Sequence, residues 1–413
     1  MNKLWGAAAL ALALAACGND TAADDQPPPS TAVYYGQVDQ ILNDNCVQCH
    51  SANADRLAPF SLATYTDAVA AAGDQAVAYA VMQRQMPPYY ADNDGSCGHY
   101  DTKWLSDDQI QTLTAWFNGA HTAGDASQAS PPPGQLPTLA RVDATLDPGA
   151  TYAPPASAGT DLYRCFLVDP GLTADKFLVG DYVHPKNNAI VHHVIVFALP
   201  DAAAEAQATA LDAQDQQLGY DCFGGPGVDS ASFLIGWAPG QGAINFPATT
   251  GVRVKGGRKL VMQVHYNLTN LSVDSSPDQT TVDLMFADAV DHEAQIASVR
   301  GDVNLPPHQA DATADGTRKL PATTLKLWGS ALHMHTRGTK AEVDTGSSCL
   351  IKLDQWSFHW QHFYWNTQPT TIPASSTVKV TCHYDTGDDT SPVVWGEKTT
   401  DEMCLAYLYM TQN

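Results

Sequence analysis

Histidines in the second half of the chain stand at spacings that suit metal binding. The apolar, strand-like run VHHVI places His192 beside His193, and the run QVHY holds Gln263 and His265. Neighbouring residues of a strand face opposite sides, so His192 and His193 can bind one metal only where the strand kinks or ends. The pattern predicts a histidine cluster that depends on such an irregularity.

A second group of potential ligands lies nearer the C-terminus. His333 and His335 stand two residues apart, which places both imidazoles on one face of a strand. Met403 lies within Glu402-Met403-Cys404, and its thioether is a soft metal ligand. Taken singly, a buried histidine or methionine more often packs in a core than binds a metal. The interpretation therefore depends on these motifs occurring together.

The N-terminal third contains CVQCH, the attachment motif for c-type haem. Cys46 and Cys49 would bond to the haem, and His50 would be the proximal iron ligand. Met86, followed by two prolines, is the predicted distal ligand, because a thioether opposite histidine favours electron transfer. Met82 is the competing candidate. The stretch resembles a single-haem class I cytochrome c.

The first residues predict export. Lys3 precedes an apolar run that is too short to span a bilayer, and Leu14-Ala15-Ala16-Cys17 resembles a bacterial lipoprotein cleavage site. Cys17 would then carry the lipid, as part of a signal segment 1–17 followed by a tether 18–32. An ordinary cleaved signal is the alternative. The expectation is a lipoprotein of a Gram-negative bacterium, anchored on the periplasmic side or in the outer membrane.

The elements that must position these residues fall into a helical part, a linker and a β region. More than one domain is expected for a chain of 413 residues. Residues 33–123 are typical of an all-α domain, and 124–160 of a proline-rich linker. From 161 onward short β-rich runs without intervening helices predict two β-sandwiches, 161–290 and 291–413. The net charge of −23 argues against nucleic-acid partners, which require basic surface. Six cysteines outside the haem motif and Cys17 suggest disulfides in an oxidising compartment.

In order, spacing and flanking residues, the four β-region motifs resemble the copper type II, ascorbate-dependent monooxygenases, the family of dopamine β-hydroxylase and peptidylglycine α-hydroxylating monooxygenase. The resemblance covers roughly 161–410 and implies two tandem jelly-roll-like sandwiches with one copper each. It assigns an electron-transfer copper to His192, His193 and His265 and an oxygen-binding copper to His333, His335 and Met403. It also implies that Gln263 orients a ligand and that two disulfides form, Cys165–Cys222 and Cys382–Cys404.

The chain also departs from that family. Peptide-amidating members carry an arginine at the position of Ala331 and an asparagine at the position of Leu405, whereas Tyr407 retains an aromatic hydroxyl. A glycine-extended peptide is therefore a poor substrate, and an apolar or uncharged one is expected. The pairing of Cys97 and Cys349 stays open between a bridge joining the haem and copper modules and two buried thiols.

The hypothesis is a copper-dependent monooxygenase that hydroxylates a C–H bond of a small molecule with O2. The fused haem c would pass electrons to copper, after reduction by a redox-protein or quinol-linked donor. The rival hypotheses are a non-catalytic copper-binding lipoprotein and an electron-transfer lipoprotein.

Overall fold

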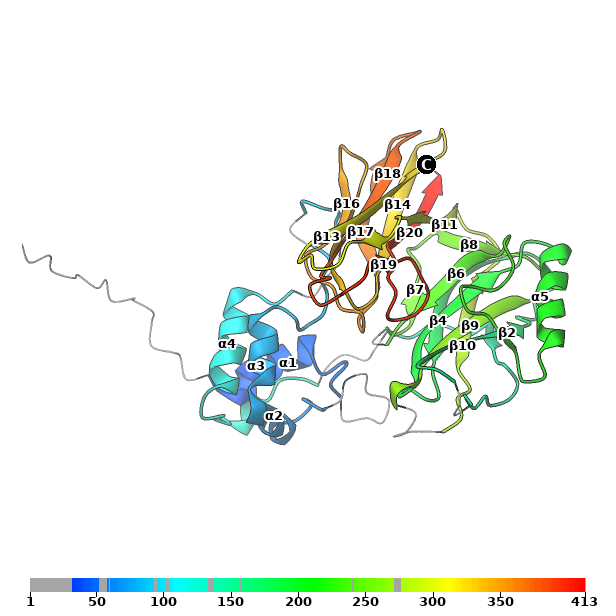
Figure 1. The fold of residues 1–413 in the computed structure, drawn as a ribbon. Helices are drawn as coiled ribbons and strands as arrows, with labels where there is room; N and C mark the ends of the chain where they lie inside the picture. The colour runs from blue at the N-terminus through cyan, green and yellow to red at the C-terminus, as the bar shows by residue number, and fades with distance from the viewer. Residues whose placement is uncertain are drawn as a thin grey trace, which may run out of the picture.

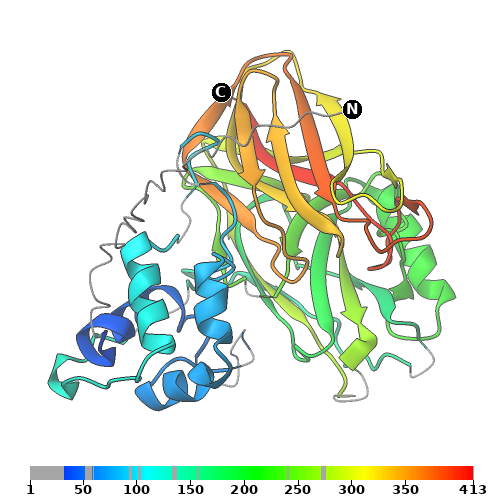
Figure 2. The same cartoon turned by 60° about the vertical axis from the view of Figure 1, so that its left-hand side comes forward.

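The computed structural model describes residues 32–51, 58, 60–92, 95–100, 104–132, 137–155, 158–239, 241–270 and 276–412. The expected signal segment, Cys17 and nearly all of the expected tether lie outside these residues. A small helical unit lies beside two β domains (Figure 1, Figure 2). Among the described helices, none is both long and apolar enough to cross a membrane.

The helical unit packs short helices around an apolar core. The helix Asp107–Phe117 is capped by Ser106, whose side chain accepts from Gln109 N while Gln109 Oε1 accepts from Ser106 N, a reciprocal N-terminal cap. Leu42, Leu113 and Trp116 are among the buried core residues. The elements are η1 (Tyr34–Val38), α1 (Asp39–Asn45), α2 (Tyr65–Ala71), η2 (Ala72–Asp74), α3 (Ala76–Met82), α4 (Asp107–Phe117) and η3 (Ala126–Gln128).

The stretch between α3 and α4 leaves the helical unit and joins the second β domain. Ala91 and Tyr100 are buried in that domain's core, and the Tyr100 hydroxyl donates to Leu350 O. A disulfide joins Cys97 to Cys349. The pairing left open by the sequence is therefore the bridge, and it ties the helical unit to the β region.

Part of the expected linker 124–160 takes part in the fold of the first β domain. Residues 144–146 form a strand of the largest sheet, and Leu146 and Tyr152 are buried in the first β core. Their burial stabilises the segment in a way that its proline-rich surroundings did not reveal.

The first β domain comprises β1 (Ala144–Leu146), β2 (Asp161–Val168), β3 (Lys176–His184), β4 (Val191–Ala198), α5 (Ala202–Gln214), β5 (Tyr220–Asp221), β6 (Ser232–Trp237), β7 (Ile244–Asn245), β8 (Thr250–Val254), β9 (Leu260–Asn267), η4 (Leu268–Asn270) and β10 (Thr281–Ala287). The second comprises β11 (His292–Arg300), β12 (Asn304–Leu305), β13 (Ala312–Lys319), β14 (Leu325–His333), β15 (Gly338–Asp344), β16 (Cys349–Leu353), β17 (Phe363–Ile372), β18 (Thr377–Tyr384), β19 (Val393–Val394) and β20 (Leu405–Gln412).

One nine-stranded sheet runs through both β domains, in the order β1-β10-β3-β8-β11-β20-β14-β17, with β7 paired to β3. The domains meet where β8 and β11 pair in parallel. A five-stranded sheet, β5-β2-β9-β4-β6, packs on the first half, and β13-β18-β15-β16 packs on the second. The expected pair of sandwiches is confirmed. The two sandwiches share one sheet, and no local sequence pattern predicts this sharing.

Candidate metal centres

Strand alternation places a histidine cluster on the outer face of the five-stranded sheet. Along β9, Met262, Val264 and Tyr266 point into the first sandwich core, so the residues between them point the other way. His265 is one of these outward residues, and His193 lies opposite it on β4. The two strands thus present adjacent imidazoles on one face.

His192 reaches the same face because β4 is irregular at that point. Val191 pairs with Tyr266 and His193 pairs with His265, so the register of β4 against β9 shifts at His192. An extra residue of this kind bends a strand and redirects its side chains. The irregularity that the sequence required for His192 and His193 to converge is therefore present.

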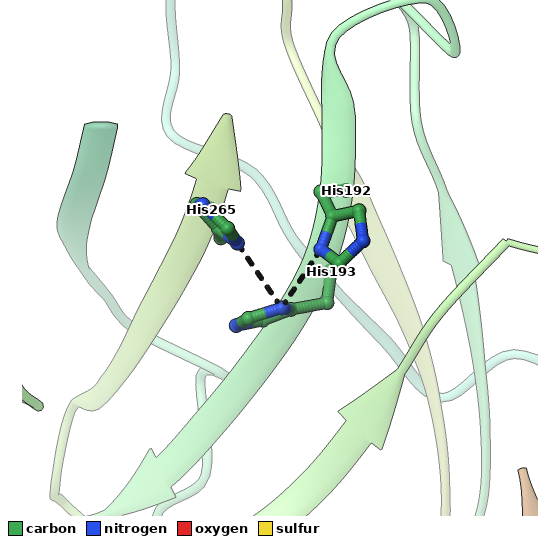
Figure 3. A group of neighbouring side chains, drawn as sticks. All are labelled: His192, His193 and His265. Atoms are coloured by element: carbon green, nitrogen blue, oxygen red, sulfur yellow. Dashed lines mark hydrogen bonds between the residues drawn. The ribbon is translucent and has the colours of Figure 1, made fainter. Parts of the chain in front are cut away.

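The three imidazoles converge through their Nδ1 atoms (Figure 3). His193 Nδ1 lies 3.3 Å from His192 Nδ1 and 3.3 Å from His265 Nδ1, and the ligand atoms of the group lie within 4.8 Å of one another. His192 Nε2 is buried without a hydrogen-bond partner. Three nitrogens that face one another at this spacing form a site for a metal ion that favours imidazole, such as copper.

Two residues that the sequence did not single out hold His265 in place. Asp161 Oδ1 accepts from His265 Nε2 at 3.0 Å, which leaves Nδ1 directed toward the other histidines. The Tyr163 ring stacks on His265 with a centroid distance of 4.1 Å. Burial alone would raise the pKa of Asp161, but hydrogen bonds from His265 and Thr399 outweigh it and lower the pKa to about 2.

The cluster histidines are held in their neutral form. Burial, followed by nearby histidines, lowers the pKa of His192 to about 3, and burial lowers the pKa values of His193 and His265. The same causes lower the pKa of His333 to about 3, and burial lowers that of His335 to about 4. Neutral imidazole is the form that binds a metal ion.

The second set of predicted ligands lies at the end of β14 and just before β20. His333 Nδ1 donates to Gln361 Oε1 at 2.5 Å, and His335 Nδ1 donates to Asp401 O at 3.1 Å. These bonds leave Nε2 of each ring for a metal, the opposite choice from the first cluster. Met403 is 5% exposed and lines the same cavity as both histidines. The structure thus brings the three residues to one cavity wall.

The backbone around this second set is fixed by Glu402 and a disulfide. Buried Glu402 accepts from the backbone N–H groups of His335 and Arg337, at 2.8 and 2.7 Å, and of Met403. Burial raises the pKa of Glu402 to about 7 against the lowering effect of these bonds. Cys404 is bonded to Cys382, and Cys165 is bonded to Cys222. Both pairs are those that the resemblance implied. Met403 therefore lies between two anchored residues.

The two ligand sets face each other across the domain boundary. The ring centroids of His193 and His333 are 6.4 Å apart. Phe358 lies between the sets, stacked on His192 at 4.4 Å and 6.0 Å from the His335 ring. No sequence motif pointed to this phenylalanine, because it lies in a loop outside both motifs.

A cavity of about 300 Å³ with a mainly apolar wall is lined by all three residues of the second set and by His193 of the first. Ala331 and Leu405, the positions that depart from the peptide-amidating pattern, line this cavity, and so does Tyr407. Gln263 also lines it, but its amide donates to Cys222 O at 3.2 Å rather than to a ligand histidine. Glu397 adds a carboxyl whose pKa is raised by burial.

Most of the CVQCH residues line a separate cavity of about 400 Å³, whose wall comes from the helical unit and the second β domain. Cys46, Cys49 and His50 line it together with Met86, whose side chain is 42% exposed. His50 Nδ1 lies 3.1 Å from Phe60 O, so a bond to this carbonyl directs Nε2 away from it. Met82 does not line this cavity and is 47% exposed.

Comparison with known proteins supports a copper monooxygenase relationship for the β region. Residues 295–412, which include the second ligand set, match the copper type II ascorbate-dependent monooxygenase C-terminal domain. The chain is 26% identical over 248 residues to tyramine beta-hydroxylase of Caenorhabditis briggsae, covering 55% of the chain and 41% of that protein.

Two further relatives have similar coverage. The chain is 24% identical over 285 residues to peptidyl-glycine alpha-amidating monooxygenase A of Xenopus laevis, covering 64% of the chain and 28% of that protein. It is 23% identical over 339 residues to dopamine beta-hydroxylase of Rattus norvegicus, covering 74% and 52%. The chain thus spans about half or less of the length of these relatives.

Proposed function

We propose that the protein is a copper-dependent monooxygenase that hydroxylates a C–H bond of a small, uncharged or apolar molecule with O2. One observation carries the proposal: two unlike donor sets meet at one mainly apolar cavity, which is lined by His193 of the first set and by all three residues of the second. One set offers three Nδ1 atoms, and the other offers two Nε2 atoms and a thioether. A copper-storage protein or a docking platform needs no substrate-sized apolar cavity between its metal sites.

The donor chemistry fits copper in both positions. Imidazole suits both copper oxidation states, and the thioether of Met403 favours Cu(I). When bound, copper would supply one-electron redox chemistry and O2 activation. His192, His193 and His265 would hold one ion, and His333, His335 and Met403 the other. Asp161, Gln361 and Asp401 hold the ligand rings in the required orientation.

The cavity wall would select the substrate. Alanine at 331 and leucine at 405 give these two wall positions no polar group for a substrate carboxylate, so the chain would position its substrate there by apolar contact. Tyr407 stacks on Phe233 at 4.5 Å across the domain boundary, which shapes that wall from both domains.

We further propose that the helical unit is a cytochrome c domain with one covalent haem. The two thiols, His50 and Met86 meet at one cavity, which fits the donor set that such a haem needs. Haem would supply single electrons to the copper region. The lipid anchor at Cys17 and the periplasmic or outer-membrane location are part of the same proposal and rest on the sequence alone.

The test is the metal and haem content of purified mature protein, measured by elemental analysis and a pyridine haemochrome spectrum. Native protein should contain two copper ions and one haem c. His333→Ala and Met403→Ala should each lose about one copper ion. The matched control is His383→Ala, which removes a histidine that is bonded to Asp311 outside the cavity. Zinc or no metal in the native protein would contradict the proposal.

Oxygen consumption separates catalysis from the non-catalytic alternatives. A copper-binding or electron-transfer lipoprotein would bind the same metals without substrate-dependent oxygen uptake. The proposed enzyme should consume O2 only when substrate and a reductant are both present, and His333→Ala should abolish that uptake.

A further inference from the structure

We propose that residues Ser357 to Gln361, in the connection between β16 and β17, carry electrons from the haem cavity to the copper ligands. This inference rests on the proposed haem and copper sites and assigns a route between them. The connection belongs to the second β domain, yet it contacts the haem cavity on one side and both ligand sets on the other.

The haem side of the connection is part of the cavity wall. Ser357, His359 and Trp360 line the cavity together with Cys46, Cys49 and His50. A haem placed there would therefore be covered by the second β domain as well as by the helices. Tyr89, next to Met86-Pro87-Pro88, lies edge-on to Trp360 with a centroid distance of 5.8 Å.

The copper side of the connection touches ligands of both sets. The Phe358 ring is 8% exposed and stacks on His192 at 4.4 Å with an interplanar angle of 21°. The His359 ring lies 6.2 Å from the His192 ring. Gln361 accepts from His333 Nδ1. His359 thus links the haem cavity to a ligand histidine within one residue.

The connection is held by several contacts, which suits electron transfer because its rate depends steeply on distance. Gln361 Nε2 donates to Phe358 O at 2.8 Å, and Trp360 N donates to Ser357 O at 3.0 Å. Gln355 Nε2 donates to Gln83 O of the helical unit. The Cys97–Cys349 bridge joins the two units at the start of β16.

The electron balance is simple. Ferrous haem loses one electron to Cu(II), which gives ferric haem and Cu(I). Hydroxylation of a C–H bond with one O2 consumes two electrons and two protons and releases one water. An external one-electron donor must therefore reduce the haem twice in each cycle.

The experiment uses the full chain loaded with haem and copper, without oxygen or substrate. Laser-flash photoreduction with a flavin injects single electrons, absorbance follows haem reduction and reoxidation, and freeze-quench EPR follows the loss of Cu(II). Phe358→Leu and His359→Leu should slow haem reoxidation by roughly tenfold or more, while haem reduction keeps its native rate. Phe358→Tyr keeps a stacked ring and should restore the native rate.

The matched control is Tyr182→Leu. It removes a ring that packs on His184 with a centroid distance of 4.1 Å, and Tyr182 lines neither the haem cavity nor the cavity of the ligand sets. Native reoxidation rates in both Phe358→Leu and His359→Leu, or equal slowing in Tyr182→Leu, would overturn the route. Native protein without a haem c spectrum would overturn the haem proposal first and the route with it.

Discussion

Replacing Asp161 with alanine removes the carboxylate that orients His265, and the contacts give a scale for the loss. Asp161 Oδ1 and His265 Nε2 are 3.0 Å apart, in side chains that are 7% and 2% exposed. A hydrogen bond to a charged group contributes about 1.5–3 kcal/mol. Without it, the His265 ring can take orientations and tautomers that do not present Nδ1 to the cluster.

Because about 1.4 kcal/mol corresponds to a tenfold change, copper affinity at the histidine cluster should fall roughly 10- to 100-fold in Asp161→Ala. Asp161→Asn keeps an acceptor oxygen and should lose less. Anaerobic competition with a chromophoric Cu(I) chelator measures the affinity, and EPR of the Cu(II) form shows which of the two sites has changed.

The matched control is Asp283→Asn. Asp283 accepts from His184 Nε2 at the same distance of 3.0 Å, but this pair lies outside both ligand sets. It should bind copper as the native protein does. Native copper affinity in Asp161→Ala would refute the orienting role, as would equal losses in Asp161→Ala and Asp283→Asn.

Three further outcomes are expected. Paired Cys97→Ser and Cys349→Ser should lower the free energy of unfolding by about 2–5 kcal/mol in chemical denaturation, because the bridge closes a loop of sequence separation 252. Burial raises the pKa of Asp181 to about 8. The free energy of unfolding relative to that of Asp181→Asn should therefore fall by up to about 1.4 kcal/mol per pH unit from about pH 4 to 8. The exposed Asp229→Asn is the control, and a pH-independent difference in free energy between native protein and Asp181→Asn would contradict the reasoning. Glu397→Gln should leave turnover of an uncharged substrate close to native, because such a substrate is held by apolar contact and not by the Glu397 carboxyl in the cavity wall; a marked loss of turnover in steady-state oxygen uptake would contradict an uncharged substrate.

The sequence alone predicted the β-rich region and the candidate ligands, because their signals are local. Short β-rich runs predicted strands from residue 161 onward, and β2 to β20 lie there. The spacing of His333 and His335 placed both on one face, and their ring centroids are 5.2 Å apart. The adjacency of His192 and His193 also indicated that they could bind one metal only where their strand is irregular.

Only the tertiary structure decided how these pieces meet. Asp161 and His265 are separated by 104 residues, and Gln361 and His333 by 28, so no local pattern pairs them. The register shift at His192 depends on pairing with β9. Pairing of β8 with β11 joins the two sandwiches into one sheet.

The contact between the helical unit and the β region likewise combines a feature that the local sequence predicted with one that only the tertiary structure decided. CVQCH predicted a haem site from five consecutive residues, whose chemistry is local. The wall that Ser357, His359 and Trp360 add to that cavity arises because Ala91 and Tyr100 are buried in another domain's core and Cys97 bonds to Cys349. Burial of apolar surface between distant segments determines this arrangement, and such burial depends on the whole fold rather than on any single stretch of sequence.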